Sequence, residues 1–360
     1  MTVGMVQIVQ RLSPGGIETL ALGLAARLPG RNPVLSLEGS TAELIAAWPA
    51  LAEAPGPILG LEKPPGVSPA FVLRLALRLR ALAPRAVVAH HIGPLLYGAV
   101  AARLACVPVV AYVEHDIWHY QAARDRKLTR VIGGLVNPQV VAISRGVADH
   151  VSTIMPGARI RIIRNAVDTD RFVPGDQGRA RARLGLPPSV TAETFLVGTV
   201  GRLEHVKGHD VLIDAMEMLP GVHLAIVGHG SQAQALQTRS TLLGLNDRVH
   251  FLGHRSDMEQ VYPAFDVLCL PSRNEGLPLA MLEAQACNVP VVASDVGSAF
   301  EGLCPGTGAI VQPDEPDELA DILMEVLEQP GGPKLRAFVL DNFSWARMVG
   351  AYQDLVDARP

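Results

Sequence analysis

Residues 273–295 read RNEGLPLAMLEAQACNVPVVASD, and this stretch carries the most informative pattern of the chain. Glu275 comes just before a predicted helix, and Glu283 lies inside it by roughly two turns. Eight positions advance an α-helix by about 800°, within about 80° of a whole number of turns, so the two carboxylates are expected on neighbouring faces. Gly276 would let backbone N–H groups approach a ligand, and a helix N-terminus attracts anions.

Anion capture beside two carboxylates suits a ligand with a diphosphate at its centre and hydroxyl groups at both ends, as in a sugar nucleotide. The alternative is an ordinary strand–loop–helix unit, in which Asn274 caps the helix and Glu283 is solvated. Spacing alone favours the ligand site only modestly.

The composition indicates a globular protein with large cores. The chain has 360 residues, of which 49% are hydrophobic and 18% charged, and this length predicts two domains. The longest apolar stretch, 94–113, is interrupted by Arg103 and Pro108, and we expect a helix followed by a buried strand there. No secretory signal pattern is visible at the start. Four cysteines without a CxxC motif are expected to be buried, reduced thiols of a cytoplasmic protein: Cys106, Cys269, Cys287 and Cys304.

Charge is distributed unevenly along the chain. Residues 1–170 hold 17 Lys/Arg and 11 Asp/Glu, a net of +6, whereas residues 171–360 hold 14 and 24, a net of −10. The basic first half is therefore expected to meet something anionic.

Short apolar runs alternate with helical patterns in both halves. Unalternated runs of this kind predict parallel sheets that helices cover on both faces. The runs are 5–9, 33–37, 86–89, 107–113, 140–143 and 160–163, then 195–200, 222–227, 249–252, 267–270, 289–293 and 309–311. Because the pattern restarts near residue 195, after a polar stretch at 174–194, we expect an α/β protein with two facing Rossmann-like domains and a cleft between them. A single large barrel is the less favoured alternative.

Two basic residues follow the strand predicted at 195–200. Arg202 and Lys207 lie between its end and the next helix, where the two-domain arrangement has its cleft. Fixed cations there would stabilise the charge that grows on a departing nucleoside diphosphate. A surface arginine and a lysine at a helix start would explain them about equally well.

The first half offers two weaker signals. Gly15 and Gly16 lie between the first strand and a helix, which makes a phosphate- or sugar-contacting loop plausible, although a glycine pair is usually only a turn. His115 follows the strand at 107–113 and would face the cleft, and at least one of His90 and His91 is expected to do the same.

Two further motifs favour a structural interpretation. The segment Gly228-His-Gly230 imitates a dinucleotide fingerprint, but Asp247 falls in a loop rather than at the next strand end, so a turn or a backbone contact is favoured over NAD binding. Asp168-Thr-Asp170 matches a short metal-binding pattern but lies near the domain boundary, where a loop role is favoured. No His/Cys/Asp spacing predicts zinc.

Taken together, these segments resemble the retaining glycosyltransferases of family 4, which have the GT-B fold. The matching segments occur in family order and cover nearly the whole chain: Gly15-Gly-Ile-Glu, Glu114-His-Asp, Asn165-Ala-Val-Asp, Val200-Gly-Arg-Leu with Lys207-Gly, Val227-Gly-His-Gly, Asn274-Glu-Gly-Leu-Pro and the Glu275/Glu283 pair. Ala166 stands where the family often has glycine, which puts only a local turn in question.

The resemblance implies a role for each matching residue. Arg202 and Lys207 would hold the diphosphate, Glu275 would contact hydroxyls of the donor sugar, and Glu283 would bind the ribose. His115 would touch the transferred sugar near its reacting carbon. The remaining donor-binding residues are Gly15, Gly16, Gly276, Leu277 and Leu279. No metal and no cofactor are expected.

The resemblance also implies how the chain is divided and what it binds. We expect an acceptor-binding domain at 1–172, a nucleotide-sugar domain at 173–342 and a C-terminal helix at 343–360 that returns to the first domain. The donor would be a UDP-, GDP- or ADP-sugar and the acceptor a saccharide or lipid-linked saccharide, with no nucleic acid partner. The alternatives are a sugar-nucleotide epimerase or phosphorylase of the same fold, or a non-catalytic sugar-nucleotide-binding protein.

Arginines alternate with apolar residues on a predicted helix of the basic half. Arg74, Arg78 and Arg80 could be solvated ends of a core helix, an interpretation slightly favoured, or could meet anionic lipid head groups. We therefore expect a cytoplasmic protein with possible peripheral contact to the inner membrane face.

Overall fold

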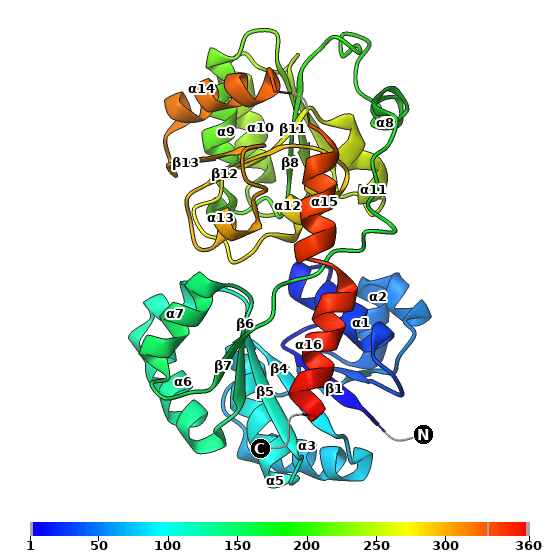
Figure 1. Ribbon diagram of the computed structural model, residues 1–360, viewed down its shortest axis with the longest axis vertical. Helices are drawn as coiled ribbons and strands as arrows, with labels where there is room; N and C mark the ends of the chain where they lie inside the picture. The colour runs from blue at the N-terminus through cyan, green and yellow to red at the C-terminus, as the bar shows by residue number, and fades with distance from the viewer. Residues whose placement is uncertain (1–2, 330, 358–360) are drawn as a thin grey trace. The chain divides into compact units, whose positions relative to one another are not determined.

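Two parallel sheets form the framework of the computed structural model, which describes residues 3–329 and 331–357 (Figure 1). Unit 1 comprises the described residues up to Ala166 and from Trp345 onward, and unit 2 comprises Val167–Ser344. Each unit is a Rossmann-like domain, so the predicted two-domain α/β class is confirmed.

The sheet of unit 1 has seven strands in the order β3-β2-β1-β4-β5-β6-β7, and every pair is parallel. Its strands are β1 (Met5–Val9), β2 (Val34–Ser36), β3 (Ile58–Gly60), β4 (Ala86–His90), β5 (Val109–Glu114), β6 (Gln139–Ala142) and β7 (Ile160–Ile162). Its helices are α1 (Gly16–Arg27), α2 (Thr41–Ala47), α3 (Pro69–Leu82), α4 (Ile92–Pro94), α5 (Val100–Leu104), α6 (Ala123–Val136), α7 (Arg145–Ile154) and α16 (Trp345–Asp357).

The sheet of unit 2 has six parallel strands in the order β10-β9-β8-β11-β12-β13. Its strands are β8 (Leu196–Val200), β9 (His223–Val227), β10 (Val249–Gly253), β11 (Val267–Leu270), β12 (Val291–Ser294) and β13 (Ala309–Val311). Its helices are α8 (Gln177–Arg183), α9 (His209–Ala215), α10 (Ala233–Leu242), α11 (Met258–Val261), α12 (Leu279–Ala286), α13 (Ala299–Gly302), α14 (Pro316–Leu327) and α15 (Pro333–Asn342).

Each predicted apolar run contains a strand, because the central strands are buried on both faces and their residues need no polar alternation. The converse does not hold for β3, a strand that lies outside every predicted apolar run. Its three residues are only partly buried, and it lies at the sheet edge, so its apolar signal is weak. One cysteine also differs from expectation. Cys106 is exposed, because it follows the end of α5 in a left-handed turn (φ 57°) before β5 begins.

The C-terminal helix α16 belongs to unit 1, as the resemblance implied, and packs beside α1 (Figure 1). The guanidinium carbon of Arg27 lies 4.6 Å from the ring centre of Trp345, a cation–π contact between these helices. Arg85 forms an ion pair with Asp357 near the other end of α16.

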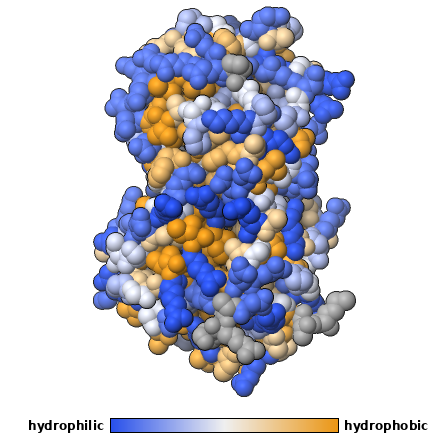
Figure 2. Space-filling view, viewed as in Figure 1, coloured by the Kyte–Doolittle hydropathy of each residue, from blue (hydrophilic) through white to orange (hydrophobic). Residues whose placement is uncertain are grey.

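Helix α3 presents a mixed surface. Leu73 and Leu77 are 60% and 69% exposed and lie among the exposed arginines of the same helix. Among the described residues no helix combines the length and the apolar character needed to cross a bilayer. Figure 2 shows hydrophilic and hydrophobic residues side by side on the face it presents.

A buried histidine at the start of α9 couples the stability of the protein to pH. Burial lowers the pKa of His209 to about 4, whereas an unfolded histidine titrates near 6.5. Between these values only the unfolded state takes up the proton, so the contribution of His209 is complete above pH 6.5 and falls as the pH drops toward 4.

We therefore predict that the free energy of unfolding falls less in His209→Gln than in the wild type when the pH is lowered from 7 to 5. The difference should be about 2 kcal/mol, because the wild type loses about 1.4 kcal/mol more for each pH unit below 6.5. Urea unfolding followed by circular dichroism at both pH values measures the difference. His254→Gln, which changes an exposed histidine, is the control. Identical pH dependence of the wild type and His209→Gln would contradict the assignment.

Candidate active site

The donor-site residues predicted from sequence follow two neighbouring strands of unit 2. β8 pairs with β9 on one side and β11 on the other, so the strand order reverses between β8 and β11. Loops that leave such a point run to opposite faces of the sheet and open a crevice at the carboxyl ends of the strands. Arg202 and Lys207 follow β8, and Glu275 follows β11.

Two of these residues form an ion pair. The Nζ of Lys207 lies 2.5 Å from Oε1 of Glu275, and the Ser272 hydroxyl donates to the same oxygen at 2.8 Å. The Lys207 and Glu275 side chains are only 22% and 11% exposed. The Arg202 side chain is exposed, and no ion pair joins it to any other described residue. The site thus combines a compensated cation with an accessible one.

The loop that carries Glu275 is anchored by a residue that sequence reasoning did not assign. Arg273 donates to both carboxylate oxygens of Asp210, at 2.9 and 2.8 Å, and to Asp314 at 2.7 Å. It also donates to the carbonyl of His205 at 2.6 Å. Forked, charge-assisted contacts of this kind hold a loop in one position. The arginine begins the quoted stretch, but its partners lie 41 or more positions away.

Helix α12 begins later than the sequence predicted. It starts at Leu279, and Pro278 has an extended backbone (ψ 126°), so Glu283 lies about one turn inside the helix, not two. The residue before a proline avoids the α region, which delays the start. Glu275 and Glu283 are therefore not separated by eight helical positions, and the predicted angle between their faces is wrong. Asn274 is not the cap, because Pro278 occupies that position.

Glu283 on α12 is held by a hydrogen bond. The Tyr262 hydroxyl donates to Glu283 at 2.6 Å. Burial raises the pKa of Glu283, and the Tyr262 hydrogen bond opposes part of that rise. The carbonyl of Gly276 accepts from the Ser298 N–H at 3.3 Å. Leu277 is buried, and Leu279 is partly buried.

The Gly228-His-Gly230 segment has a packing role. A Cβ on Gly228 would lie 1.8 Å from the carbonyl oxygen of Gly201, and one on Gly230 would lie 2.4 Å from that of Leu203. The two loops after β8 and β9 can therefore approach only because these positions lack side chains. The favoured interpretation as a turn agrees with this geometry.

Asp168 also serves its own loop. Its Oδ1 accepts the N–H groups of Asp170 and Arg171, both at 3.2 Å, and this turn leads into Phe172. Side chains of Asp commonly stabilise turns in this way, which agrees with the favoured loop role.

In unit 1 the strand order reverses between β1 and β4. Gly15 and Gly16 follow β1, and α1 begins at Gly16 after an extended Gly15 (φ −170°). His91 follows β4, and His115 follows β5. The first-half residues predicted from sequence therefore lie at the carboxyl edge of this sheet.

His115 is part of a buried chain of polar side chains. Its Nε2 lies 3.0 Å from Nδ1 of His90, whose Nε2 lies 2.7 Å from the amide oxygen of Gln7. Burial and the neighbouring His91 lower the pKa of His90 to about 3, and burial with His90 and His91 holds the pKa of His115 well below its usual range. Both rings are neutral, so one donates and the other accepts.

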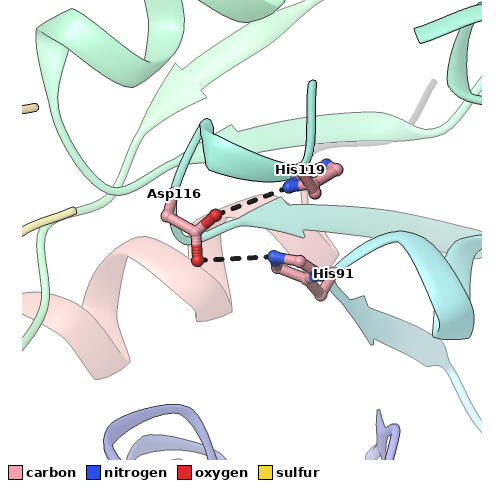
Figure 3. A group of neighbouring side chains, drawn as sticks. All are labelled: His91, Asp116 and His119. Carbon is pink, nitrogen blue, oxygen red and sulfur yellow. Dashed lines mark hydrogen bonds and ion pairs between the residues drawn. The ribbon is translucent and has the colours of Figure 1, made fainter. Parts of the chain in front are cut away.

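A second histidine group lies beside this chain and was not foreseen. Asp116 directs one carboxylate oxygen to Nε2 of His91 and the other to Nδ1 of His119, each at 3.4 Å (Figure 3). His91 and His119 also line a pocket of about 500 Å³ together with Gln10, Trp118 and Asp125. Asp116 and His119 are three positions apart, but the convergence with His91 depends on the pairing of β4 with β5.

Two carboxylates, the buried Glu114 and the partly buried Asp116, shift the pKa values of the histidines in this group. Burial lowers the pKa of His119, but hydrogen bonds and charge from Asp116 and Glu114 raise it overall to about 9. The same carboxylates raise the pKa of His91 above its usual value despite burial. Burial raises the pKa of Asp116, but the two rings bring it below its usual range.

The chain resembles known proteins along nearly its whole length. Residues 188–339 match the sequence profile of the "Glycosyl transferases group 1" family, and residues 14–171 match that of "Glycosyltransferase Family 4". A D-inositol 3-phosphate glycosyltransferase of Mycolicibacterium gilvum is 40% identical over 207 residues, which is 54% of this chain and 46% of that protein. The chain therefore spans about half the length of the curated relatives it matches.

Solved structures share the fold. HepE of Anabaena in complex with UDP-glucose is 26% identical with a TM-score of 0.83, and the match covers 98% of each chain. The sucrose-phosphate synthase of Thermosynechococcus elongatus is 22% identical with a TM-score of 0.81 over 98% of each chain.

Both sheets have the Rossmann strand order, the matching profiles divide between the two halves, and structures of this fold align with nearly the whole chain. The chain belongs to the family 4 (group 1) glycosyltransferases of the GT-B fold.

Proposed function

We propose that this protein transfers a hexose-type sugar from a nucleoside diphosphate sugar to a saccharide or lipid-linked saccharide, with retention of configuration. The observation that carries the proposal is the Lys207–Glu275 pair, together with the exposed Arg202 on the same loop as Lys207, at the point where the strand order of unit 2 reverses. Cations at that position suit a diphosphate, and the carboxylate suits sugar hydroxyls.

We assign the diphosphate to Arg202 and Lys207, and the donor-sugar hydroxyls to Glu275. Glu283 would take the ribose, with backbone from Gly276, Leu277 and Leu279 near sugar and phosphate. In unit 1, Gly15 and Gly16 would approach the diphosphate and acceptor, and His115 would lie near the reacting carbon. Solved HepE binds UDP and UDP-glucose, which makes UDP-sugars the first donors to test.

The chemistry needs neither a covalent intermediate nor a metal at the diphosphate. Arg202 and Lys207 would stabilise the charge that develops on the departing diphosphate. The same phosphate, on the face that the acceptor attacks, would take the proton of the acceptor hydroxyl. Lys207 exchanges part of its contact with Glu275 for the diphosphate, so the ion pair holds the lysine in place before the donor arrives.

The acceptor class has a second candidate. The curated relatives carry the name D-inositol 3-phosphate glycosyltransferase, so a phosphorylated polyol is to be tested beside saccharides. An epimerase or a phosphorylase of the same fold would convert its substrate without such an acceptor, and a non-catalytic binder would convert nothing. Product analysis with and without acceptor across UDP-, GDP- and ADP-sugars separates these functions.

The cationic residues give the first kinetic prediction. Arg202→Ala and Lys207→Ala should each lower kcat/KM at least about tenfold, equivalent to about 1.4 kcal/mol of transition-state stabilisation. Arg239→Ala is the matched control, since Arg239 is a half-exposed arginine of the same unit paired with Asp214. Normal turnover in both folded variants would remove these residues from the diphosphate site.

The two carboxylates should differ in their kinetic effect. Glu283→Ala should raise the donor KM by about tenfold or more, because a ribose contact is the same in ground and transition states. Glu275→Gln should lower kcat. It should not weaken UDP binding, because the substitution removes a negative charge that competes with the diphosphate for Lys207. Steady-state kinetics and UDP titrations measure both effects. The same profile in the two variants is the contrary result.

The surface of helix α3 suggests that the protein binds its acceptor at a membrane. The exposed Leu73 and Leu77 lie among Arg74, Arg78 and Arg80, a combination that suits the surface of an anionic membrane. We propose peripheral binding to the inner membrane face by this helix, which agrees with the net charge of the first half and with a lipid-linked acceptor.

Binding to anionic vesicles should therefore weaken when the three α3 arginines are changed to Gln, by about 1 kcal/mol per residue, and should fall with added salt. The control with equal charge loss changes three exposed arginines outside α3: Arg159, Arg161 and Arg179. Sedimentation with anionic and neutral vesicles provides the measurement. If both triple variants lose binding equally, the effect comes from net charge and not from helix α3.

A further inference from the structure

The group formed by His91, Asp116 and His119 has a geometry that the proposed sugar transfer does not require. One donor atom from each residue lies within 4.8 Å of the other two. The separation of 3.4 Å between each imidazole nitrogen and its carboxylate oxygen is long for a hydrogen bond. Two ligand atoms of an ion with bonds of about 2.0–2.1 Å lie about 3.3 Å apart in a tetrahedral site, which is close to these separations, and here the separations run to the two different oxygens of Asp116.

The Nε2 atoms of both rings are buried, and their contacts with carboxylates are long. Neither atom is accessible to solvent. Nε2 of His91 lies 3.4 Å from Asp116 and 3.7 Å from Glu114, and Nε2 of His119 lies 3.4 Å from Glu114. The two ring centres are only 4.3 Å apart. A metal ion within bonding distance of Nε2 of His91 would replace these long contacts with a short one.

The backbone holds His91 in a costly conformation. His91 has φ 74° and ψ 177°, which residues other than glycine rarely adopt and which costs about 1–3 kcal/mol. This turn at the end of β4 places the ring opposite Asp116. Strain of this kind persists where the surrounding structure needs the side chain in one position.

A second layer of residues orients His119. Its Nδ1 faces Asp116, while its Nε2 lies 3.4 Å from Oε2 of the fully buried Glu114. Glu114 is itself held by the hydroxyls of Tyr112 and of Tyr120, the latter at 2.6 Å. A carboxylate behind the outer nitrogen of a histidine ligand is the usual support of a metal-binding imidazole, because it fixes the tautomer and the ring orientation.

We propose that His91, Asp116 and His119 bind a divalent transition-metal ion of the zinc class in unit 1. Two imidazoles and one carboxylate suit such ions, whereas Mg²⁺ and Ca²⁺ prefer oxygen ligands throughout. Because both histidines line the pocket of about 500 Å³, the ion presents its remaining coordination position to that pocket. A small ligand that enters the pocket would reach the ion through an oxygen or nitrogen atom. Sequence reasoning foresaw no metal, and this site is separate from the diphosphate residues of unit 2.

The test measures metal binding directly, without nucleotide sugar or acceptor. The full chain is freed of metal with EDTA, desalted and titrated with Zn²⁺ in competition with a chromophoric chelator. The wild type is expected to bind one equivalent of Zn²⁺ with high affinity.

His91→Ala and Asp116→Asn should each lower the Zn²⁺ affinity at least about 100-fold, and Glu114→Gln should lower it about tenfold. Millimolar Mg²⁺ should not displace the zinc. His250→Ala is the matched control, since His250 pairs with His223 at 2.9 Å but is not in the group.

Co²⁺ substitution gives a second measurement. The visible spectrum of the bound ion should show low-coordinate nitrogen and oxygen ligation in the wild type, and His91→Ala should lose it. The His91 side chain is 20% exposed, so this variant avoids opening the core, and its thermal unfolding reports whether it folds. The proposal is wrong if the wild type binds no equivalent of metal, or if folded His91→Ala and Asp116→Asn bind it unchanged. The group would then be only an internal cluster of ion pairs. Either outcome is independent of sugar transfer, which is measured on unit 2 variants.

Discussion

The parallel pairing of β8 with β11 is the contact on which the residues proposed for the donor site depend. It places the ends of two strands that are about 70 positions apart side by side, and it marks the reversal of strand order in unit 2. Only this pairing brings Lys207 within 2.5 Å of Glu275. A partly buried lysine without a partner would be destabilising, and Glu275 supplies the partner of Lys207.

Loop packing makes that arrangement rigid. The backbone after β8 lies against the backbone after β9 at Gly228 and Gly230, and Arg273 fastens the loop after β11 to Asp210 at the start of α9. Three neighbouring loops are thus connected by backbone contact and charge-assisted hydrogen bonds. Preorganised groups of this kind stabilise developing charge without reorganising during reaction. The glycines and Arg273 therefore support the site although none is assigned to the ligand.

Sequence reasoning succeeded where a signal is local and failed where it depends on three-dimensional convergence. Buried parallel strands show as apolar runs, so twelve strand positions could be predicted, while the partly exposed edge strand β3 gave no such signal. Lys207 was singled out by its place after a strand, and Glu275 by its place before a predicted helix, but their ion pair was not predicted. The start of α12 was missed because Pro278 overrides the helical pattern. His91 could not be assigned to Asp116, because their approach requires strand pairing and a left-handed backbone that no composition reveals.

Glu114 imposes the corresponding constraint in unit 1. Its side chain is fully buried, and the two tyrosine hydroxyls satisfy hydrogen bonds but supply no positive charge. A buried carboxylate without a cation nearby is costly, so positive charge must come from His119, His91 or an ion that both rings bind. Asp116 adds a second negative charge within 3.4 Å of both rings. Two carboxylates facing two imidazoles therefore favour a positive species between them. A divalent ion held by His91, Asp116 and His119, whose ligand atoms lie within 4.8 Å of one another, would supply that charge.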